Sequence, residues 1–182
     1  MQELRFHGRG GQGTVVASIL LAEAFFSAGF QVQSFPAFGV ERRGAPVEAY
    51  LRIDLQKILL RTSITAPDGV LVQDSHLLAT VDVAKGLKPN GWILVNTPEG
   101  EGISGPFSGY RVAWVDATRI GVEQGLGTRT HPMVNTAIDG ALARVMEAPP
   151  LDCITAAIRD QISVAPDRNI AAALQAYETV QF

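Results

Sequence analysis

Residues 8–14, Gly-Arg-Gly-Gly-Gln-Gly-Thr, constrain the fold of this chain more than any other segment. The residues before them (4–6) have the character of a short strand, and the Ala- and Leu-rich run after them (15–26) has that of a helix. Glycines let a chain turn sharply and bring backbone N–H groups close to a ligand. The N-terminus of the following helix favours negative charge. The segment therefore predicts a turn suited to a phosphate or carboxylate.

Gly8, Gly10 and Gly13 match the Gly-x-Gly-x-x-Gly spacing of dinucleotide-binding proteins. Such a site also needs an acidic residue at the end of the second strand, about 20 residues further on. We expect that strand at residues 30–35, where Gln33 and Ser34 occupy the place of the acid. NAD binding is therefore not predicted. Two interpretations of the loop stay open: it binds an anion or cofactor, or its glycines only permit tight packing of strand and helix.

The length of 182 residues predicts a single domain spanning residues 1–182. A net charge of -3 with no basic run argues against nucleic acid, and no apolar run is long enough for a membrane span. The first residues lack the apolar segment of a signal peptide, so we expect a cytoplasmic protein. One cysteine excludes an internal disulfide and a four-thiolate iron–sulfur cluster within this chain. The three histidines show no metal-site spacing and are expected to be structural.

A second unusual segment spans residues 37–46 and carries Phe38, two glycines, Pro46 and the adjacent pair Arg42 and Arg43. In an open α/β sheet, the loops at the carboxyl ends of the strands line the ligand crevice. We expect this loop to lie beside the glycine turn, at the same end of an adjacent strand. The arginines would then clamp a phosphate or carboxylate, or pair with acidic residues of a partner. The alternative is a solvated arginine pair on an exposed loop.

The remaining patterns predict an α/β fold, namely a three-layer α/β/α domain with a mostly parallel sheet and an antiparallel edge. Further strands are expected at 47–53, 70–73, 92–95 and 111–115, with 57–61 as an antiparallel partner of the first of these. Helices are expected at 81–87, 119–125, 134–143, 151–162 and 166–177. The small residues Ala137, Gly140 and Ala141 favour close helix packing.

Polar residues follow several of the predicted strands. Asp74 is expected to cap the next helix rather than act as a base, and Asp116 or Thr118 to cap the helix after residue 115. Asn96 lies at the carboxyl end of a core strand. Asn135 stands near the start of a helix, where it either caps the helix or reaches a ligand.

Several catalytic motifs are missing from the sequence. There is no Gly-x-Ser-x-Gly nucleophile elbow. Gln12 stands where a phosphate-binding loop of an ATPase needs Gly-Lys-Ser/Thr nearby. There is also no Gly-Asp-Gly segment of the kind that holds thiamine diphosphate and its metal. These absences favour a subunit of a larger enzyme over an enzyme that is complete in one chain.

The two glycine-containing segments, Gly-Arg-Gly-Gly-Gln-Gly at 8–13 and Ser-Phe-Pro-Ala-Phe-Gly-Val-Glu-Arg-Arg-Gly-Ala-Pro at 34–46, are distinctive together. They closely resemble the gamma subunit of 2-oxoacid:acceptor oxidoreductases, with the pyruvate:ferredoxin type as the nearest pattern. Weaker matches cover essentially the whole chain, at residues 67–68, 81–88, 96–97, 134–137, 169–170 and 177.

The resemblance implies a multi-subunit enzyme that oxidatively decarboxylates a 2-oxoacid with coenzyme A to acyl-CoA and CO2. It implies alpha, beta and delta type partners, in which thiamine diphosphate with Mg and the iron–sulfur clusters reside, and in some members an NAD or flavin subunit. This chain would pack beside the thiamine site and help to bind coenzyme A. The resemblance and the loop chemistry together select these contacts: Gly10, Gly11, Gln12, Gly13, Thr14, Phe38, Arg42, Arg43, Asn96 and Asn135. No catalytic residue and no metal ligand is expected in this chain.

One stretch departs from the family pattern. Residues 128–132, Thr-Arg-Thr-His-Pro, are not those expected of a pyruvate enzyme. This departure weakens an assignment to pyruvate. Branched-chain 2-oxoacids such as 2-oxoisovalerate, and phenylglyoxylate, stay open beside pyruvate as substrates, as do ferredoxin and NAD as acceptors. The competing interpretation is a standalone nucleotide- or anion-binding module without catalysis.

Overall fold

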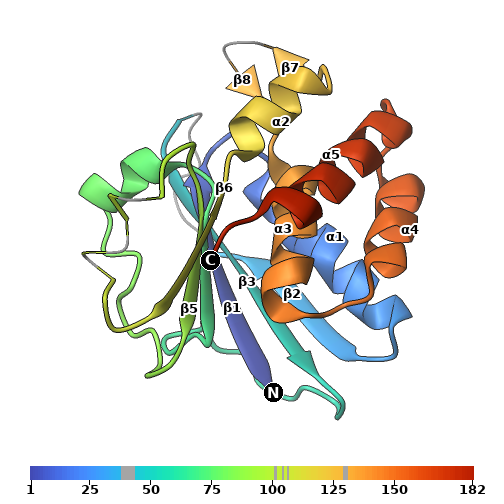
Figure 1. The fold of residues 1–182 in the computed structure, drawn as a ribbon. Coiled ribbons are helices and arrows are strands. Elements are labelled where there is room, and N and C mark those ends of the chain that lie inside the picture. Colours follow the sequence, from blue (N-terminus) through green and yellow to red (C-terminus); the bar gives the residue numbers. More distant parts are fainter. Residues whose placement is uncertain (38–43, 101, 104, 106, 129–130) are drawn as a thin grey trace.

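The computed structural model describes residues 1–37, 44–100, 102–103, 105, 107–128 and 131–182. Its elements, drawn in Figure 1, are β1 (Gln2–Arg9), α1 (Thr14–Ser27), β2 (Gln31–Pro36), β3 (Pro46–Asp54), β4 (Gly69–Val72), the 3-10 helix η1 (Ser75–Ala79), β5 (Trp92–Asn96), β6 (Arg111–Val115), α2 (Ala117–Glu123), β7 (Gly127–Thr128), β8 (His131–Pro132), α3 (Asn135–Met146), α4 (Leu151–Gln161) and α5 (Pro166–Thr179). Among these helices, none is both long and apolar enough to cross a membrane.

The main sheet has the strand order β2-β3-β1-β4-β5-β6. The pairs β1–β4, β4–β5 and β5–β6 are parallel, whereas β3 runs antiparallel to both of its neighbours. The predicted α/β fold with a mostly parallel sheet and an antiparallel edge is thus confirmed. A separate hairpin of β7 and β8 lies beyond α2 (Figure 1).

Two expectations about strand neighbours are wrong. The strand at 30–35 was expected beside the first strand, but β3 lies between β2 and β1. The strand expected at 57–61 does not form, and β2 is the antiparallel partner of β3 instead. Burial explains both results: five consecutive residues of β3 are buried, as suits an interior strand, while no residue of β2 is buried. The polar sequence of β2 suits the sheet edge.

The helices α1, α3, α4 and α5 cover one face of the sheet (Figure 1) and share a single hydrophobic core with it. α3 is central to this layer, because it contacts α1, α4 and α5. The predicted close packing of small residues is confirmed at Gly140, where a Cβ atom would collide with the backbone carbonyl of Ala173 on α5. Ala137 and Ala141 are fully buried beside it.

The other face of the sheet is covered by η1 and by irregular segments. Val70, Val72, Ile93 and Val95 of the central strands form a second apolar cluster with side chains from these segments, Leu77 among them. The helix predicted at 81–87 is wrong, since this segment consists of turns.

Arg5 explains why the segment 81–87 is irregular. Its guanidinium donates to the carbonyls of Val83 and Lys85 at 2.9 and 2.7 Å, which ties two successive turns to β1. Gly86 has a φ of 75°, which is outside the range of a right-handed helix. The buried arginine thus fixes the turns in place of the backbone hydrogen bonds of a helix.

His7 lies next to Arg5 on this face and has an exposed fraction of only 3%. Arg5 Nε donates to His7 Nε2 at 3.0 Å, and His7 Nδ1 lies 3.5 Å from Glu48 Oε1. Burial is the largest cause that lowers the pKa of His7 to about 4, and the nearby charge of Arg5 acts in the same direction against that of Glu48. His7 is therefore neutral at physiological pH.

Because His7 is buried in its neutral form, we predict that the free energy of unfolding decreases in acid. As the pH falls below 6.5, the unfolded chain takes up a proton that folded His7 does not accept until about pH 4, so the folded state loses about 3 kcal/mol over that window. His7→Gln, which still accepts from Arg5, should remove this part of the pH dependence. The change in the free energy of unfolding between pH 6.5 and pH 4.5 is measured with urea. His76→Gln, which replaces an exposed histidine, is the control. Equal pH dependence in His7→Gln and the parent chain would contradict the prediction.

Candidate functional site

A pocket of about 290 Å³ opens where the glycine turn between β1 and α1 meets the carboxyl ends of β4 and β5. We call it the glycine-loop pocket. Its lining comprises Arg9, Gly10, Gly11, Gln12, Gly44, Gln73, Asn96, Thr118, His131, Pro132 and Val134. The carboxyl edge of a parallel sheet is the usual place for a ligand in α/β proteins. The pocket therefore lies where the glycine turn predicted a binding site.

Positive φ angles give the turn its shape. Gly11 and Gly13 have φ values of 95° and 74°, which glycine adopts without strain. Gly13 is the N-cap of α1, and among the described residues no side chain caps the helix there. The 14-residue helix thus begins next to the lining residue Gln12, and no described side chain caps its first N–H groups. Backbone donors and the positive end of the helix dipole together favour an anion at this point.

The segment after residue 43 is fastened to the glycine turn. The N–H of Gly10 donates to the Ala45 carbonyl at 2.9 Å, and the N–H of Gly44 donates to the Gly10 carbonyl at 3.0 Å. The two glycine-containing segments therefore lie together, as expected, but for a different reason: β3 begins opposite the end of β1, with Pro46 paired to Arg9. Phe38, Arg42 and Arg43 lie outside the described residues.

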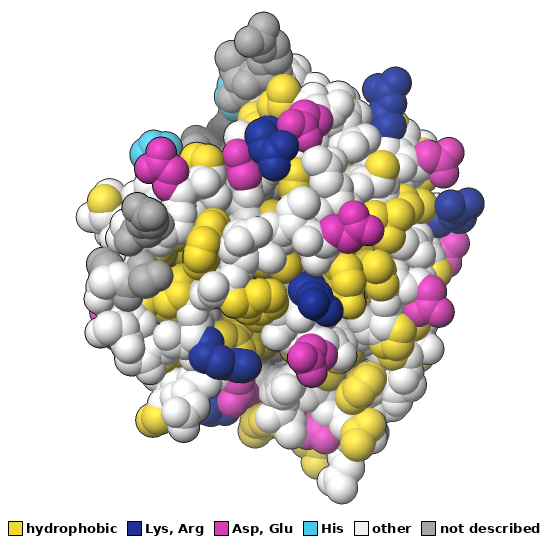
Figure 2. All heavy atoms as spheres, in the orientation of Figure 1, with side chains coloured by type: hydrophobic (Ala, Val, Ile, Leu, Met, Phe, Trp, Pro, Cys, Tyr) yellow, Lys and Arg dark blue, Asp and Glu magenta, His cyan; other side chains and the backbone are white. Residues whose placement is uncertain are grey.

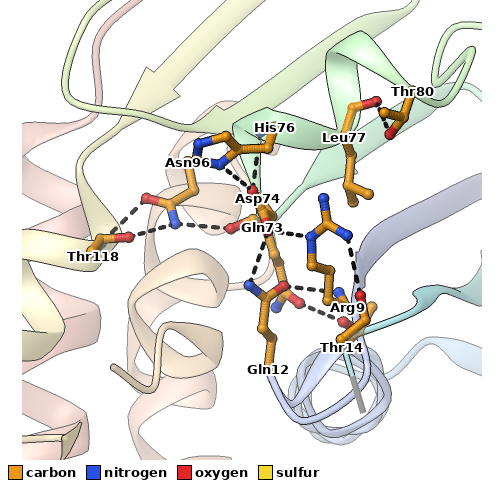
Figure 3. Close-up of polar contacts among 11 residues, drawn as sticks. Arg9, Gln12, Thr14, Gln73, Asp74, His76, Leu77, Thr80, Asn96 and Thr118 are labelled. Atoms are coloured by element: carbon orange, nitrogen blue, oxygen red, sulfur yellow. Dashed lines mark hydrogen bonds and ion pairs between the residues drawn. The ribbon is translucent and has the colours of Figure 1, made fainter. Parts of the chain in front are cut away.

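Arg9 is paired with a carboxylate at the rim of the pocket (Figure 3). Its Nε donates to Asp74 Oδ2 at 2.6 Å, and its guanidinium also donates to the Gly44 carbonyl at 3.1 Å. Gln12 adds a long hydrogen bond to the same oxygen at 3.4 Å. The charge of Arg9 is therefore largely neutralised before any ligand arrives.

Asp74 accepts hydrogen bonds with both carboxylate oxygens. Its Oδ1 accepts from the backbone N–H of His76 at 3.0 Å, which confirms its predicted role as a helix cap. Partial burial of the carboxyl opposes its ionisation, but the hydrogen bonds from Arg9 and His76 outweigh this effect and lower the pKa of Asp74. Asp74 thus stays ionised as a structural anchor, not as a base.

A second set of polar contacts forms the floor of the pocket (Figure 3). The Thr14 hydroxyl donates to Gln73 Oε1 at 2.6 Å, and Asn96 Nδ2 donates to the Gln73 carbonyl and the Thr118 hydroxyl, both at 2.9 Å. The N–H of Thr118 donates to Asn96 Oδ1 at 3.2 Å, while Asp116 is the residue that caps α2. These contacts join α1, β4, β5 and α2.

The structure brings some of the predicted site residues together and leaves others apart. Gly10, Gly11, Gln12 and Asn96 line the pocket. Gly13 and Thr14, at the start of α1, follow Gln12 in the chain but are not among the lining residues.

Asn135 lies behind the loop. Its exposed fraction is 1%, and a Cβ atom on Gly13 would lie 3.2 Å from its amide nitrogen. Of its two expected roles, that of a helix cap is not seen: the N-cap of α3 is Val134, and no side chain of the described residues caps the helix. The side chain instead fills the space against the glycine, which requires the absence of a Cβ there.

Seven of the lining residues were not selected as site residues from the sequence: Arg9, Gly44, Gln73, Thr118, His131, Pro132 and Val134. A usable signal exists for Gln73, because it directly follows an apolar strand, as Asn96 does at the end of the next one. Thr118 gives no such signal, since it lies in the first turn of a helix. His131 and Pro132, from the stretch that departs from the family pattern, also line the pocket.

The fold and the pocket define a class, that of α/β proteins with a glycine-rich turn at the carboxyl edge of the sheet. The chain belongs to the pyruvate ferredoxin/flavodoxin oxidoreductase family, whose model matches residues 3–179. The resemblance drawn from the two glycine segments is thereby confirmed.

The chain is also similar in sequence to individual subunits of oxidoreductases. The chain is 46% identical over 185 residues to the pyruvate/ketoisovalerate oxidoreductases common subunit gamma of Pyrococcus abyssi, covering all of this chain and 98% of that one. It is 48% identical over 160 residues to pyruvate synthase subunit PorC of Methanocaldococcus jannaschii, covering 88% of this chain and 85% of that one. Both relatives are single subunits of larger enzymes by name.

Solved structures share the fold. The crystal structure of pyruvate oxidoreductase subunit PORC from Thermotoga maritima superimposes with a TM-score of 0.83 at 35% identity, over 99% of this chain and 97% of that one. The 2-oxoglutarate:ferredoxin oxidoreductase of Magnetococcus marinus, solved with 2-oxoglutarate, coenzyme A and succinyl-CoA bound, matches with a TM-score of 0.73 at 18% identity. This chain corresponds to only 30% of that longer chain, so the likeness concerns the fold of one part.

Proposed function

We propose that this chain is the gamma subunit of a multi-subunit 2-oxoacid oxidoreductase and that its glycine-loop pocket binds part of coenzyme A. The complex would convert a 2-oxoacid, coenzyme A and an oxidised acceptor into acyl-CoA, CO2 and the reduced acceptor. Thiamine diphosphate and iron–sulfur clusters in partner subunits would supply the decarboxylation chemistry and the path for two electrons. This chain would hold the co-substrate and would be inactive alone.

The uncapped start of α1 beside the pocket is the observation that carries the proposal. The phosphate groups of coenzyme A need directed donors, and the first turn of a helix supplies backbone N–H groups with a favourable dipole. The pocket of about 290 Å³ suits one portion of coenzyme A. The described residues thus fit a phosphate group of that molecule.

Exposed apolar side chains support a subunit role. Phe26, Leu55, Leu59, Val164 and Phe182 are each more than 60% exposed. On the face shown in Figure 2, hydrophobic side chains lie open between basic and acidic ones that do not gather by sign. Apolar surface of this kind is what partner subunits cover.

The relatives guide the choice of substrate and acceptor. Because one relative is common to pyruvate and ketoisovalerate enzymes and another belongs to a pyruvate synthase, pyruvate and branched-chain 2-oxoacids are the proposed substrates. The family description names ferredoxin and flavodoxin, which favours a small electron-transfer protein over NAD as acceptor.

A matched pair of substitutions at Gly11 tests the coenzyme A contact. Gly11→Asp places a carboxylate at the mouth of the pocket, and Gly11→Asn places a neutral side chain of the same size at the same φ of 95°. Repulsion of a phosphate by the carboxylate should raise the KM for coenzyme A at least tenfold in Gly11→Asp relative to Gly11→Asn, with kcat within twofold. The assay uses the assembled complex with pyruvate or 2-oxoisovalerate and a dye acceptor.

Two results would count against this proposal. Equal KM values for coenzyme A in the two Gly11 variants would show that the pocket does not bind coenzyme A. Recovery of the chain from its native cell as a monodisperse protein that carries a nucleotide and no partners would instead favour the standalone module.

A further inference from the structure

Gln73 is the residue directly after β4, and its exposed fraction is 1% although it lines the glycine-loop pocket. Its backbone is fixed at both ends: its N–H donates to the His7 carbonyl at 2.8 Å, and its carbonyl accepts from Asn96 Nδ2 at 2.9 Å. Its side-chain oxygen accepts from the Thr14 hydroxyl at 2.6 Å. Of the polar atoms of Gln73, only the side-chain nitrogen Nε2 lacks a hydrogen-bond partner among the described residues.

An unpaired amide nitrogen at this position needs a physical explanation. More than about 90% of buried polar groups in proteins are hydrogen-bonded, and leaving one unpaired costs about 1–3 kcal/mol. Gln73 is nevertheless held rigidly, and the hydroxyl that holds it belongs to Thr14, the first residue of α1. Gln73, which carries the orphan donor and lines the pocket, therefore lies directly beside the first residue of α1 (Figure 3).

We propose that Gln73 Nε2 donates a hydrogen bond to an oxygen of the ligand in the glycine-loop pocket, directly or through one water, and that Thr14 is the positioning residue that aims this amide. The inference rests on the proposed function, which makes that oxygen part of a phosphate group of coenzyme A. Bound ligand would give the buried amide the partner that it lacks without it.

The pairing of Arg9 explains why a neutral donor matters here. The Arg9 guanidinium is engaged by Asp74 Oδ2 at 2.6 Å and by the Gly44 carbonyl. Among the described lining residues, the ligand would therefore meet neutral amide groups, from backbone and side chain, more than net positive charge. Such donors recognise an oxygen by direction and distance, which gives Gln73 a part in specificity.

Two variants of Gln73 test the donor in the assembled complex, with coenzyme A as the varied substrate. Gln73→Met removes the amide at similar volume, and Gln73→Glu keeps the shape while it turns the donor into an acceptor. Both should raise the KM for coenzyme A at least fivefold, Gln73→Glu more than Gln73→Met, with kcat within twofold. Gln73→Met should unfold within a few degrees of the parent chain without ligand, because the removal of an unpaired amide nitrogen offsets the loss of the acceptor of the Thr14 hydroxyl.

Thr14 offers a matched pair for the positioning role. Thr14→Ser keeps the hydroxyl that donates to Gln73 Oε1 and should keep the KM for coenzyme A within twofold. Thr14→Val keeps the side-chain shape without the donor and should raise the KM by an intermediate factor at unchanged kcat.

The Gly11 variants separate this inference from the function on which it rests. If Gly11→Asp raises the KM for coenzyme A while both Gln73 variants leave it within twofold, the pocket binds coenzyme A and the role of Gln73 is overturned. If none of these substitutions changes the KM, both the proposed function and this inference fail.

Discussion

Replacing Arg52 with methionine is expected to lower the free energy of unfolding by about 3–5 kcal/mol, the usual cost of breaking a buried ion pair on one side. Arg52 lies on β3 with an exposed fraction of 1%. Its Nε donates to Glu3 Oε1 at 2.8 Å, and its two terminal nitrogens donate to Gln33 Oε1 at 2.8 Å and to the Thr62 carbonyl at 2.7 Å. One side chain thus joins β1, β2 and the coil after β3.

The substitution tests the polar contacts rather than the packing. Methionine fills much of the space of the arginine stem but leaves the Glu3 carboxylate with only Lys88 Nζ nearby, at 3.9 Å from its second oxygen. The measurement is urea unfolding at pH 7, with Arg61→Met, an exposed position on the same coil, as the control. A loss below 1 kcal/mol for Arg52→Met would mean that water and Lys88 replace the guanidinium at little cost.

The second large effect is expected at Asp139, and it depends on pH. Asp139 lies on α3 with no exposed surface, and neither of its carboxyl oxygens has a hydrogen-bond partner among the described residues. Burial alone raises its pKa well above the ordinary value. The folded chain therefore holds a proton on Asp139 at pH values where the unfolded chain has released it.

The direction of the effect follows from this proton. The stability due to Asp139 is fully present below about pH 3.9, the pKa of an unperturbed aspartate, and is lost as the pH rises toward its folded value, by about 1.4 kcal/mol per pH unit. Asp139→Asn should abolish this slope and gain stability over the parent chain at high pH. Because the parent chain and Asp139→Asn both contain His7, the difference between their free energies of unfolding, measured from pH 4.5 to 8.5, isolates the effect of Asp139.

An exposed carboxyl provides the control for Asp139. Asp160 lies at the surface near the end of α4, so Asp160→Asn should follow the parent curve. Parallel curves for the parent chain and Asp139→Asn over the whole range from pH 4.5 to 8.5 would show that Asp139 ionises without cost in the folded chain.

Elements with local signals could be predicted from the amino-acid sequence. The strand, glycine turn and helix of residues 4–26, the helices α3, α4 and α5 and the apolar strands β4, β5 and β6 lie within a few residues of their predicted positions. Periodicity, glycine and proline act over a few neighbouring residues, so they are readable without the fold. The two glycine segments also sufficed to identify the family.

The order of the strands in the sheet, by contrast, could not be predicted from local patterns. β3 is inserted between β2 and β1, because its side chains suit an interior strand and those of β2 suit an edge. Residues 81–87 form turns, because the buried Arg5, 78 to 80 residues away in sequence, takes their carbonyls. Contacts across such separations depend on how the whole sheet assembles, and no local pattern carries them.

The same distinction holds for the site. The sequence placed Gly10, Gly11, Gln12 and Asn96 in it, since each stands in a glycine turn or at the end of a strand. It did not select Gln73 and Thr118, among other lining residues, and it left Asn135 as a helix cap or a ligand contact, of which the capping role is not seen among the described residues. Whether a polar side chain lines a pocket, supports a loop from behind or stays without a partner depends on side chains that meet only after folding, and that is the physical reason the pocket had to be read from the structure.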